Sequence, residues 1–203
     1  MEIFISVDGV LRNIIQKFDY HYKDAFLDSE LEENTFEYNI TEPIENDNLL
    51  NSYKFQSQEE FENFLFIEYP IEIFGHAGLS YSTTFTDLNN MIYNNKEHTF
   101  TLIGLDELGK SKPATLFFLS KNGFLGSNVK FITSSDIENH WNNCDMWITD
   151  NKEIIDRCPE NKITYKFNTI YNQYFTNKLE ITKLTEIKEL CLNFSRSEEH
   201  TSE

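Results

Sequence analysis

Glycine and proline are scarce in this sequence, whose 203 residues include only seven glycines and four prolines. That scarcity excludes collagen-like and low-complexity chains, and a hydrophobic content of 39% argues against intrinsic disorder. The length suits one substantial core with an insertion better than two independent domains. We therefore expect a single globular domain.

Positive charge is also in short supply, since 17 Lys and Arg residues stand against 34 Asp and Glu residues and give a formal net charge of −17. No local cluster of basic residues offsets this excess. Phosphate backbones and anionic lipid headgroups would be repelled. Nucleic acids and membrane surfaces are therefore not expected as partners.

Long apolar runs and paired cysteines are lacking as well. No uninterrupted apolar stretch approaches the roughly 18 residues of a membrane-spanning helix. Cys144, Cys158 and Cys191 form neither a CxxC pair nor a disulfide framework, which is typical of reduced thiols. Met1-Glu2 leads directly into an apolar run without the basic start of a signal peptide, so we expect a cytoplasmic protein.

The composition and the C-terminal tail indicate where the sequence comes from. Residues 196–203, RSEEHTSE, resemble a translated sequencing adaptor and are left out of the fold prediction. Together with the many Asn, Ile, Lys, Phe and Tyr residues, the tail is typical of environmental sequencing, and a phage source is one interpretation. A scaffold or virion subunit, located in the host cytoplasm or the virion, is therefore one alternative.

Short apolar segments alternate with helical patterns along most of the chain. The patterns predict strands at 3–7, 99–103, 129–132, 146–148 and 163–167, and helices at 86–93, 113–121, 136–141 and 152–157. This repeated order favours a mainly parallel sheet between two helical layers, a Rossmann-like α/β sandwich. An apolar stripe follows on a closing helix, formed by Leu184, Ile187, Leu190, Cys191 and Phe194.

Residues 14–83 interrupt this order and are interpreted as an inserted, mostly helical cap, with residues 1–13 and 84–195 forming the core domain. The spacing of apolar residues predicts a helix at 59–67, whereas 27–51 is acidic and irregular. Five aromatic residues of this region are interpreted as core rather than as pocket lining: Phe61, Phe64, Phe66, Tyr69 and Phe74.

Ligands of open parallel sheets bind outside the carboxyl ends of the strands. The residues at those ends are Ser6 with Asp8, Gly104, Ser134 with Ser135, and Thr149 with Asp150. Two carboxylates at neighbouring strand ends, here Asp8 and Asp150, could hold Mg²⁺. The alternative is that both carboxylates only cap turns.

Two segments carry a family resemblance. Residues 3–11, IFISVDGVL, resemble the first motif of the haloacid dehalogenase superfamily, a hydrophobic strand followed by Asp-x-Asp-Gly-Thr/Val-Leu. Residues 144–154, CDMWITDNKEI, are similar to the fourth motif of its deoxyribonucleotidase-like members. The resemblance implies a Mg²⁺-dependent phosphatase in which the first aspartate attacks phosphorus and the second, matched by Asp8, protonates the leaving group.

The sequence departs from that family at every motif. Ser6 stands at the nucleophile and Thr149 replaces one of two acidic residues. The resemblance places phosphate binding at Gly104, where the family has Ser or Thr, and at Lys112, which is displaced because Thr115 stands in the lysine position. Metal binding would be left to Asp8 and Asp150.

A second motif competes with this interpretation. Residues 104–111, GLDELGKS, match the phosphate-loop pattern GxxxxGK[ST]. Against a phosphate loop, Pro113 delays the start of the helix, and Asp106 and Glu107 bring carboxylates into an anion site. His21, His76, His98 and His140 lack the spacing of a zinc site.

The leading hypothesis is a catalytically impaired phosphatase relative, a pseudophosphatase that binds a phosphorylated small molecule, a metal or a protein partner. One alternative is an active Mg²⁺-dependent phosphatase or 5'-nucleotidase with atypical residues, in which Asp8 activates Ser6 as nucleophile. The scaffold or virion subunit remains the second alternative.

Overall fold

The computed structural model describes residues 1–27, 38, 40 and 49–187. Its centre is a six-stranded parallel sheet in the order β5-β4-β1-β6-β7-β8. The strands are β1 (Glu2–Ser6), β4 (Thr99–Leu105), β5 (Val129–Ile132), β6 (Met146–Thr149), β7 (Ile163–Phe167) and β8 (Glu180–Ile181). The protein is therefore an α/β protein with a Rossmann-like sheet, as the sequence predicts.

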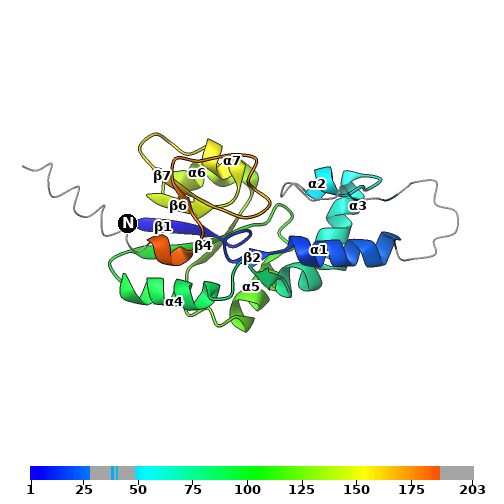
Figure 1. The fold of residues 1–203 in the computed structure, drawn as a ribbon, viewed down its shortest axis with the longest axis horizontal. Helices are drawn as coiled ribbons and strands as arrows, with labels where there is room; N and C mark the ends of the chain where they lie inside the picture. The colour runs from blue at the N-terminus through cyan, green and yellow to red at the C-terminus, as the bar shows by residue number, and fades with distance from the viewer. Residues whose placement is uncertain (28–37, 39, 41–48, 188–203) are drawn as a thin grey trace, which may run out of the picture.

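Alternate residues of β1 face two separate helical layers. Ile3 and Ile5 join a core cluster with α4 (Thr84–Asn94) and α5 (Lys112–Lys121). Phe4 points the other way, into a cluster with α6 (Ile137–Trp141) and α7 (Lys152–Asp156). Figure 1 shows these pairs of helices on opposite faces of the sheet. Because both faces are covered, β1 is apolar from Ile3 to Ile5.

Most predicted elements lie within two residues of their observed bounds, and β5 and β7 agree with the prediction at both ends. The short strand β8 has no counterpart in the prediction. The predicted closing helix begins as a single 3-10 turn, Leu184–Glu186, and the rest of its stripe falls outside the described residues. The adaptor-like tail lies outside them too.

The chain leaves and re-enters the core domain through a two-stranded antiparallel pair, β2 (Arg12–Asn13) with β3 (Gly78–Leu79). Between them lie α1 (Ile15–Tyr22), α2 (Leu49–Ser52) and α3 (Gln58–Asn63), and Figure 1 shows all three beyond one end of the sheet. The predicted helix at 59–67 is α3 continued by a π-helical turn, Phe64–Glu68. Much of the acidic stretch at 27–51 lies outside the described residues.

The inserted segment has an aromatic core of its own. Phe64 and Phe74 are buried there, and the other three predicted members, Phe61, Phe66 and Tyr69, pack against them while partly exposed. The interpretation of these five residues as core is confirmed. Ala114 of α5 belongs to the same cluster, so the insertion packs directly on the core domain.

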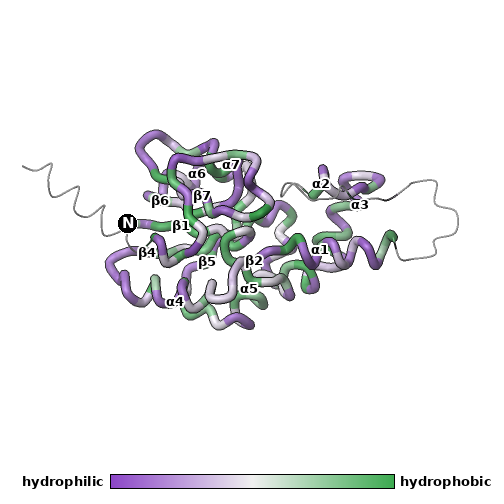
Figure 2. The backbone as a smooth tube through the Cα atoms, in the orientation of Figure 1, coloured by the Kyte–Doolittle hydropathy of each residue, from purple (hydrophilic) through white to green (hydrophobic). Residues whose placement is uncertain are grey.

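Hydrophobic segments run through the interior and hydrophilic ones along the outer loops (Figure 2). Within the part of the chain that the structure describes, no helix is long and apolar enough to cross a bilayer.

Candidate functional site

The parallel pairing of β1 with β6 brings Ser6 and Thr149 together at the carboxyl edge of the sheet. The Ser6 hydroxyl donates a hydrogen bond of 2.8 Å to Thr149 Oγ1. The same Ser6 oxygen accepts a hydrogen bond of 3.2 Å from Trp147 Nε1. Both hydroxyl groups are buried, and Thr149 also accepts the backbone N–H of Asn151 at 3.1 Å. Ser6 is therefore a member of a small internal hydrogen-bond network.

Asp8 forms an ion pair with Arg12, four residues further along the chain. Arg12 Nε lies 2.7 Å from Asp8 Oδ1, and Arg12 Nη2 lies 3.1 Å from Asp8 Oδ2. Two parallel contacts of this kind form a bidentate ion pair, the strongest geometry available to Arg and a carboxylate. Both oxygens of Asp8 are thus already engaged inside the protein.

Three further residues fix the Arg12 guanidinium, whose side chain is 1% exposed. Its Nη1 donates to the carbonyl oxygen of Phe74 at 3.1 Å, and its Nη2 donates to Thr115 Oγ1 at 3.0 Å. The guanidinium also lies 4.9 Å from the ring centre of Phe74 and 5.5 Å from that of Phe118, within cation–π range. Arg12 therefore links the β1 loop, the insertion and α5.

Asp150, at the end of β6, packs against the loop that carries Asp8. Gly9 has a φ of +76°, and a Cβ added there would lie 1.7 Å from Asp150 Oδ2. Only glycine combines that backbone conformation with so close a neighbour. The Asp-Gly pair after β1 therefore makes room for a second carboxylate.

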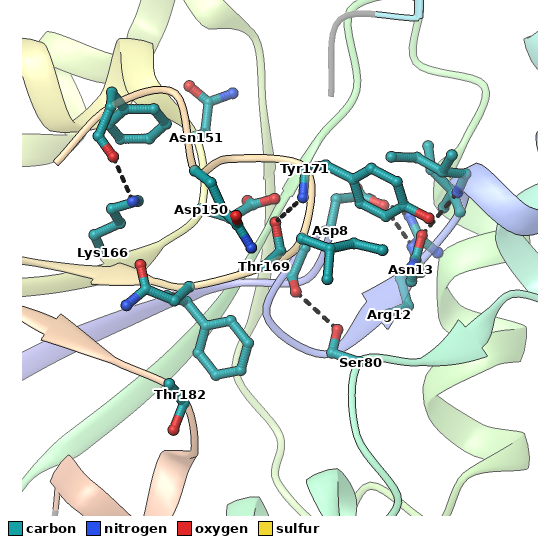
Figure 3. Close-up of a pocket in the computed structure, with 18 of the residues that line it drawn as sticks. Asp8, Arg12, Asn13, Ser80, Asp150, Asn151, Lys166, Thr169, Tyr171 and Thr182 are labelled. Atoms are coloured by element: carbon teal, nitrogen blue, oxygen red, sulfur yellow. Dashed lines mark hydrogen bonds and ion pairs between the residues drawn. The ribbon is translucent and has the colours of Figure 1, made fainter. Parts of the chain in front are cut away.

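Asp8 and Asp150 both line a cavity of about 790 Å³. It opens at the carboxyl ends of β1, β6 and β7, where open parallel sheets bind ligands. The insertion supplies Ile14, Ile15 and Leu49 to its lining, and the β7–β8 connection supplies residues 168–171 and 173. Figure 3 shows Arg12 and Lys166 on opposite sides of Asp150.

The cationic groups among the described lining residues are Arg12 and Lys166. Lys166 is 3% exposed; its ammonium donates to the Phe175 carbonyl at 2.5 Å and lies 3.7 Å from Glu180 Oε1. Hydrogen bonds from the Asn177 backbone N–H and the Asn168 amide lower the pKa of Glu180 and keep it ionised. Each cation of the lining therefore has a carboxylate partner.

Gly104 and Lys112 do not join this cavity. Gly104 is an internal residue of β4, where its Cα packs near Phe131, and the Lys112 ammonium lies 5.6 Å from the ring centre of Phe131. Neither residue is among the described residues that line the cavity. Of the predicted positions, Asp8 and Asp150 line the cavity, whereas Ser6 and Thr149 hydrogen-bond to each other and, like Gly104 and Lys112, are not among its described lining residues.

In the segment that matches the phosphate-loop pattern, a side chain of the same segment takes the place that a phosphate would occupy. Asp106 accepts hydrogen bonds from the backbone N–H groups of Lys110, Ser111 and Lys112, at 2.9, 3.0 and 3.2 Å. These N–H groups at the start of α5 are the ones a bound phosphate would need. An internal carboxylate therefore fills the anion site.

Mg²⁺ prefers carboxylate and water oxygens, and of the four positions 6, 8, 149 and 150 only Asp8 and Asp150 carry carboxylates. Positions 6 and 149 offer hydroxyl groups that bond to each other, and both Asp8 oxygens face the Arg12 guanidinium. Among the described residues, no three His, Cys, Asp or Glu side chains converge to hold a metal ion.

The sequence interpretation passed over Arg12, Trp147 and Lys166. Arg12 begins the short strand β2, four residues after Asp8, so no helical periodicity pairs the two residues. Lys166 is a charged residue within a strand buried on both faces, and such a residue needs a partner. That signal was present in the sequence and could have been used.

No family model matches the chain, and no curated protein matches it.

Proposed function

We propose that this chain is a catalytically silent relative of the haloacid dehalogenase phosphatases, in which residues 14–83 form a cap and the cavity serves ligand binding. The observation that carries the proposal is the buried hydrogen bond between Ser6 and Thr149. In the family that the sequence resembles, these positions carry carboxylates. In this chain, two hydroxyl groups form a hydrogen bond with each other instead.

The environment of Ser6 does not favour nucleophilic attack. A serine hydroxyl needs a base to become a nucleophile. Its proton is donated to Thr149, which is itself a hydroxyl group, and its lone pair accepts the Trp147 N–H. Asp8, the base that the alternative of an active enzyme requires, is paired with Arg12 instead.

Arg12 also brings a positive charge close to the position where the family's lysine is missing. The resemblance predicts a lysine where Thr115 stands, and Arg12 reaches the Thr115 hydroxyl from the β1 loop. One guanidinium thus brings positive charge to the region, while its bidentate contact with Asp8 neutralises that aspartate. This exchange supports a binding role over phosphoryl transfer.

The test is a phosphatase panel with Mg²⁺ that includes deoxynucleoside monophosphates. We expect the wild-type protein to show no turnover above a buffer control. Turnover that Asp8→Asn abolishes would support the alternative of an active phosphatase or nucleotidase instead.

Two companion variants test which residues keep the site inactive. Ser6→Asp with Thr149→Asp restores the family's carboxylates, and adding Arg12→Met releases Asp8. We expect Mg²⁺ binding, measured by isothermal titration calorimetry, only when all three changes are combined. Mg²⁺ binding by the double variant alone would show that Arg12 does not hold Asp8 away from a metal.

A further inference from the structure

We infer that the cavity binds an uncharged organic ligand that carries several hydroxyl groups beside an apolar body. This inference rests on the proposed function, because it assigns a ligand class to the cavity that the silent site leaves for binding. It differs from the phosphorylated ligand that the resemblance implies, since neutral hydrogen-bonding groups of the protein recognise the ligand.

The five charged residues of the described lining are already engaged inside the protein. Arg12 forms its bidentate ion pair with Asp8. The Lys166 ammonium lies 3.7 Å from Glu180 Oε1, and Asp150 also has an interaction partner. A charged ligand would have to displace such a partner and leave a charged side chain unpaired, which is costly in a buried site. An uncharged ligand leaves these contacts in place.

Two asparagines of the lining supply neutral hydrogen-bond donors. The side-chain oxygen of Asn13 accepts the backbone N–H of Ile15 at 3.0 Å. That of Asn151 accepts the backbone N–H of Ile154 at 3.2 Å. Neither side-chain nitrogen has a hydrogen-bond partner among the described residues. Both side chains are therefore fixed through their oxygens and keep two N–H donors each for a ligand.

Tyr171 of the β7–β8 connection adds a hydroxyl group to the lining. Its backbone N–H donates to Thr169 Oγ1 at 3.2 Å, and its ring packs against the aromatic core of the insertion. In the described part of the chain, its hydroxyl group has no hydrogen-bond partner. In Figure 3, Tyr171 and Asn13 lie to the right of Asp150, and Asn151 lies above it. Neutral hydrogen-bonding groups therefore stand at several points around the cavity, which suits a ligand with several hydroxyl groups.

The apolar residues of the lining favour a ligand with an apolar body. The insertion contributes Ile14, Ile15 and Leu49, and the sheet edge contributes Phe167 and Phe175. Cavities of roughly 300–1,000 Å³ with apolar walls and a few polar groups are typical of small-molecule sites. A cavity of about 790 Å³ lies in that range. An apolar or aromatic body with hydroxyl groups beside it matches both parts of this lining.

Two glycosides of matched shape test the inference. Phenyl β-D-glucoside is uncharged, and phenyl β-D-glucuronide carries a carboxylate in place of one hydroxymethyl group. Backbone amide shifts of Asn13, Asn151 and Tyr171 in the full-length protein report binding to the cavity. We expect saturable shifts with the glucoside at roughly 1–10 mM, and weaker shifts with the glucuronide and with the cation phenethylamine. Added NaCl should leave glucoside binding unchanged, because salt screens only charge interactions.

The variant Tyr171→Phe removes one hydroxyl group and should weaken glucoside binding about fivefold, the effect of losing one neutral hydrogen bond. Tyr93→Phe makes the same change on a ring of α4 that is 70% exposed and not among the described lining residues, and should leave binding unchanged. No binding of the glucoside, tighter binding of either charged probe, or equal effects of the two variants would overturn the inference. Hydrolysis of phenyl phosphate by the same protein with Mg²⁺ would instead contradict the proposed function.

Discussion

At the scale of single residues, Arg12 joins several parts of the chain through one side chain. It pairs with Asp8, donates to Phe74 and Thr115, and stacks on two aromatic rings while almost fully buried. A buried charge of this kind is tolerated because the guanidinium makes four hydrogen bonds, two of them to a carboxylate.

Replacing Arg12 with Met should lower the free energy of unfolding by about 3 kcal/mol, because Asp8 loses its partner and two acceptors are left without a donor. Urea unfolding measures the loss. In the Arg12→Met, Asp8→Asn double variant, part of the stability should return, since no carboxylate remains unpaired. Purely additive losses would show that the pair is not coupled.

The network around Ser6 gives a second prediction at this scale. Ser6→Ala leaves the buried Trp147 N–H without an acceptor and should cost about 2 kcal/mol of unfolding free energy. Ser135→Ala is the control, because this strand-end serine is exposed and its loss should change stability by less than about 0.5 kcal/mol. Equal effects of the two variants would contradict the buried network.

At the scale of elements, the start of α5 is held by a carboxylate from the preceding loop. Asp106 accepts three consecutive backbone N–H groups there, which gives the helix the negative charge that its N-terminus favours. The phosphate-loop pattern therefore describes a helix cap.

Asp106→Ala should destabilise the protein by about 1–2 kcal/mol, the usual effect of losing an N-terminal cap, as measured by thermal and urea unfolding. Asp106→Asn keeps one oxygen acceptor and should cost less. Saturable ATP binding by the wild-type protein would contradict this account of the motif, since Asp106 would then have to leave its N–H partners.

Strands and helices of the core domain were predictable because their apolar residues follow regular periods. Strands β5 and β7 agree at both ends, and α5 starts one residue before Pro113. The partnership of Arg12 and Asp8 was not predictable in this way, since it depends on a loop conformation and on Phe74 and Thr115, which come from distant parts of the chain. The Asp8-Gly9 pair predicts a turn after the first strand. It does not predict that the Asp150 side chain packs against that turn.

At the scale of the whole molecule, two packed helical layers bury groups that ionise only in alkali. Burial raises the pKa of Cys144 from 9.0 to about 12, and burial also raises that of Tyr81. Both groups are neutral when protonated, so the folded state disfavours their charged forms. Stability from these groups is complete below the unfolded pKa and is lost as pH rises toward the folded one.

For Cys144 this loss begins near pH 9, and the fold should lose about 1 kcal/mol between about pH 8 and pH 10 from this thiol alone. In Cys144→Ala that part of the pH dependence is absent, while the contribution of Tyr81 remains in both proteins. Urea unfolding of both proteins at the two pH values measures the difference. Identical pH dependence would contradict the burial of the thiol.

In the proposed function, Ser6 is an internal hydrogen-bonding residue and not a nucleophile. Incubation with p-nitrophenyl phosphate and Mg²⁺, followed by an acid quench and mass spectrometry of the N-terminal peptide, tests this most directly, because a serine phosphate ester would survive the quench. We predict an unmodified peptide. One phosphoryl group on Ser6, lost in Asp8→Asn, would contradict the account.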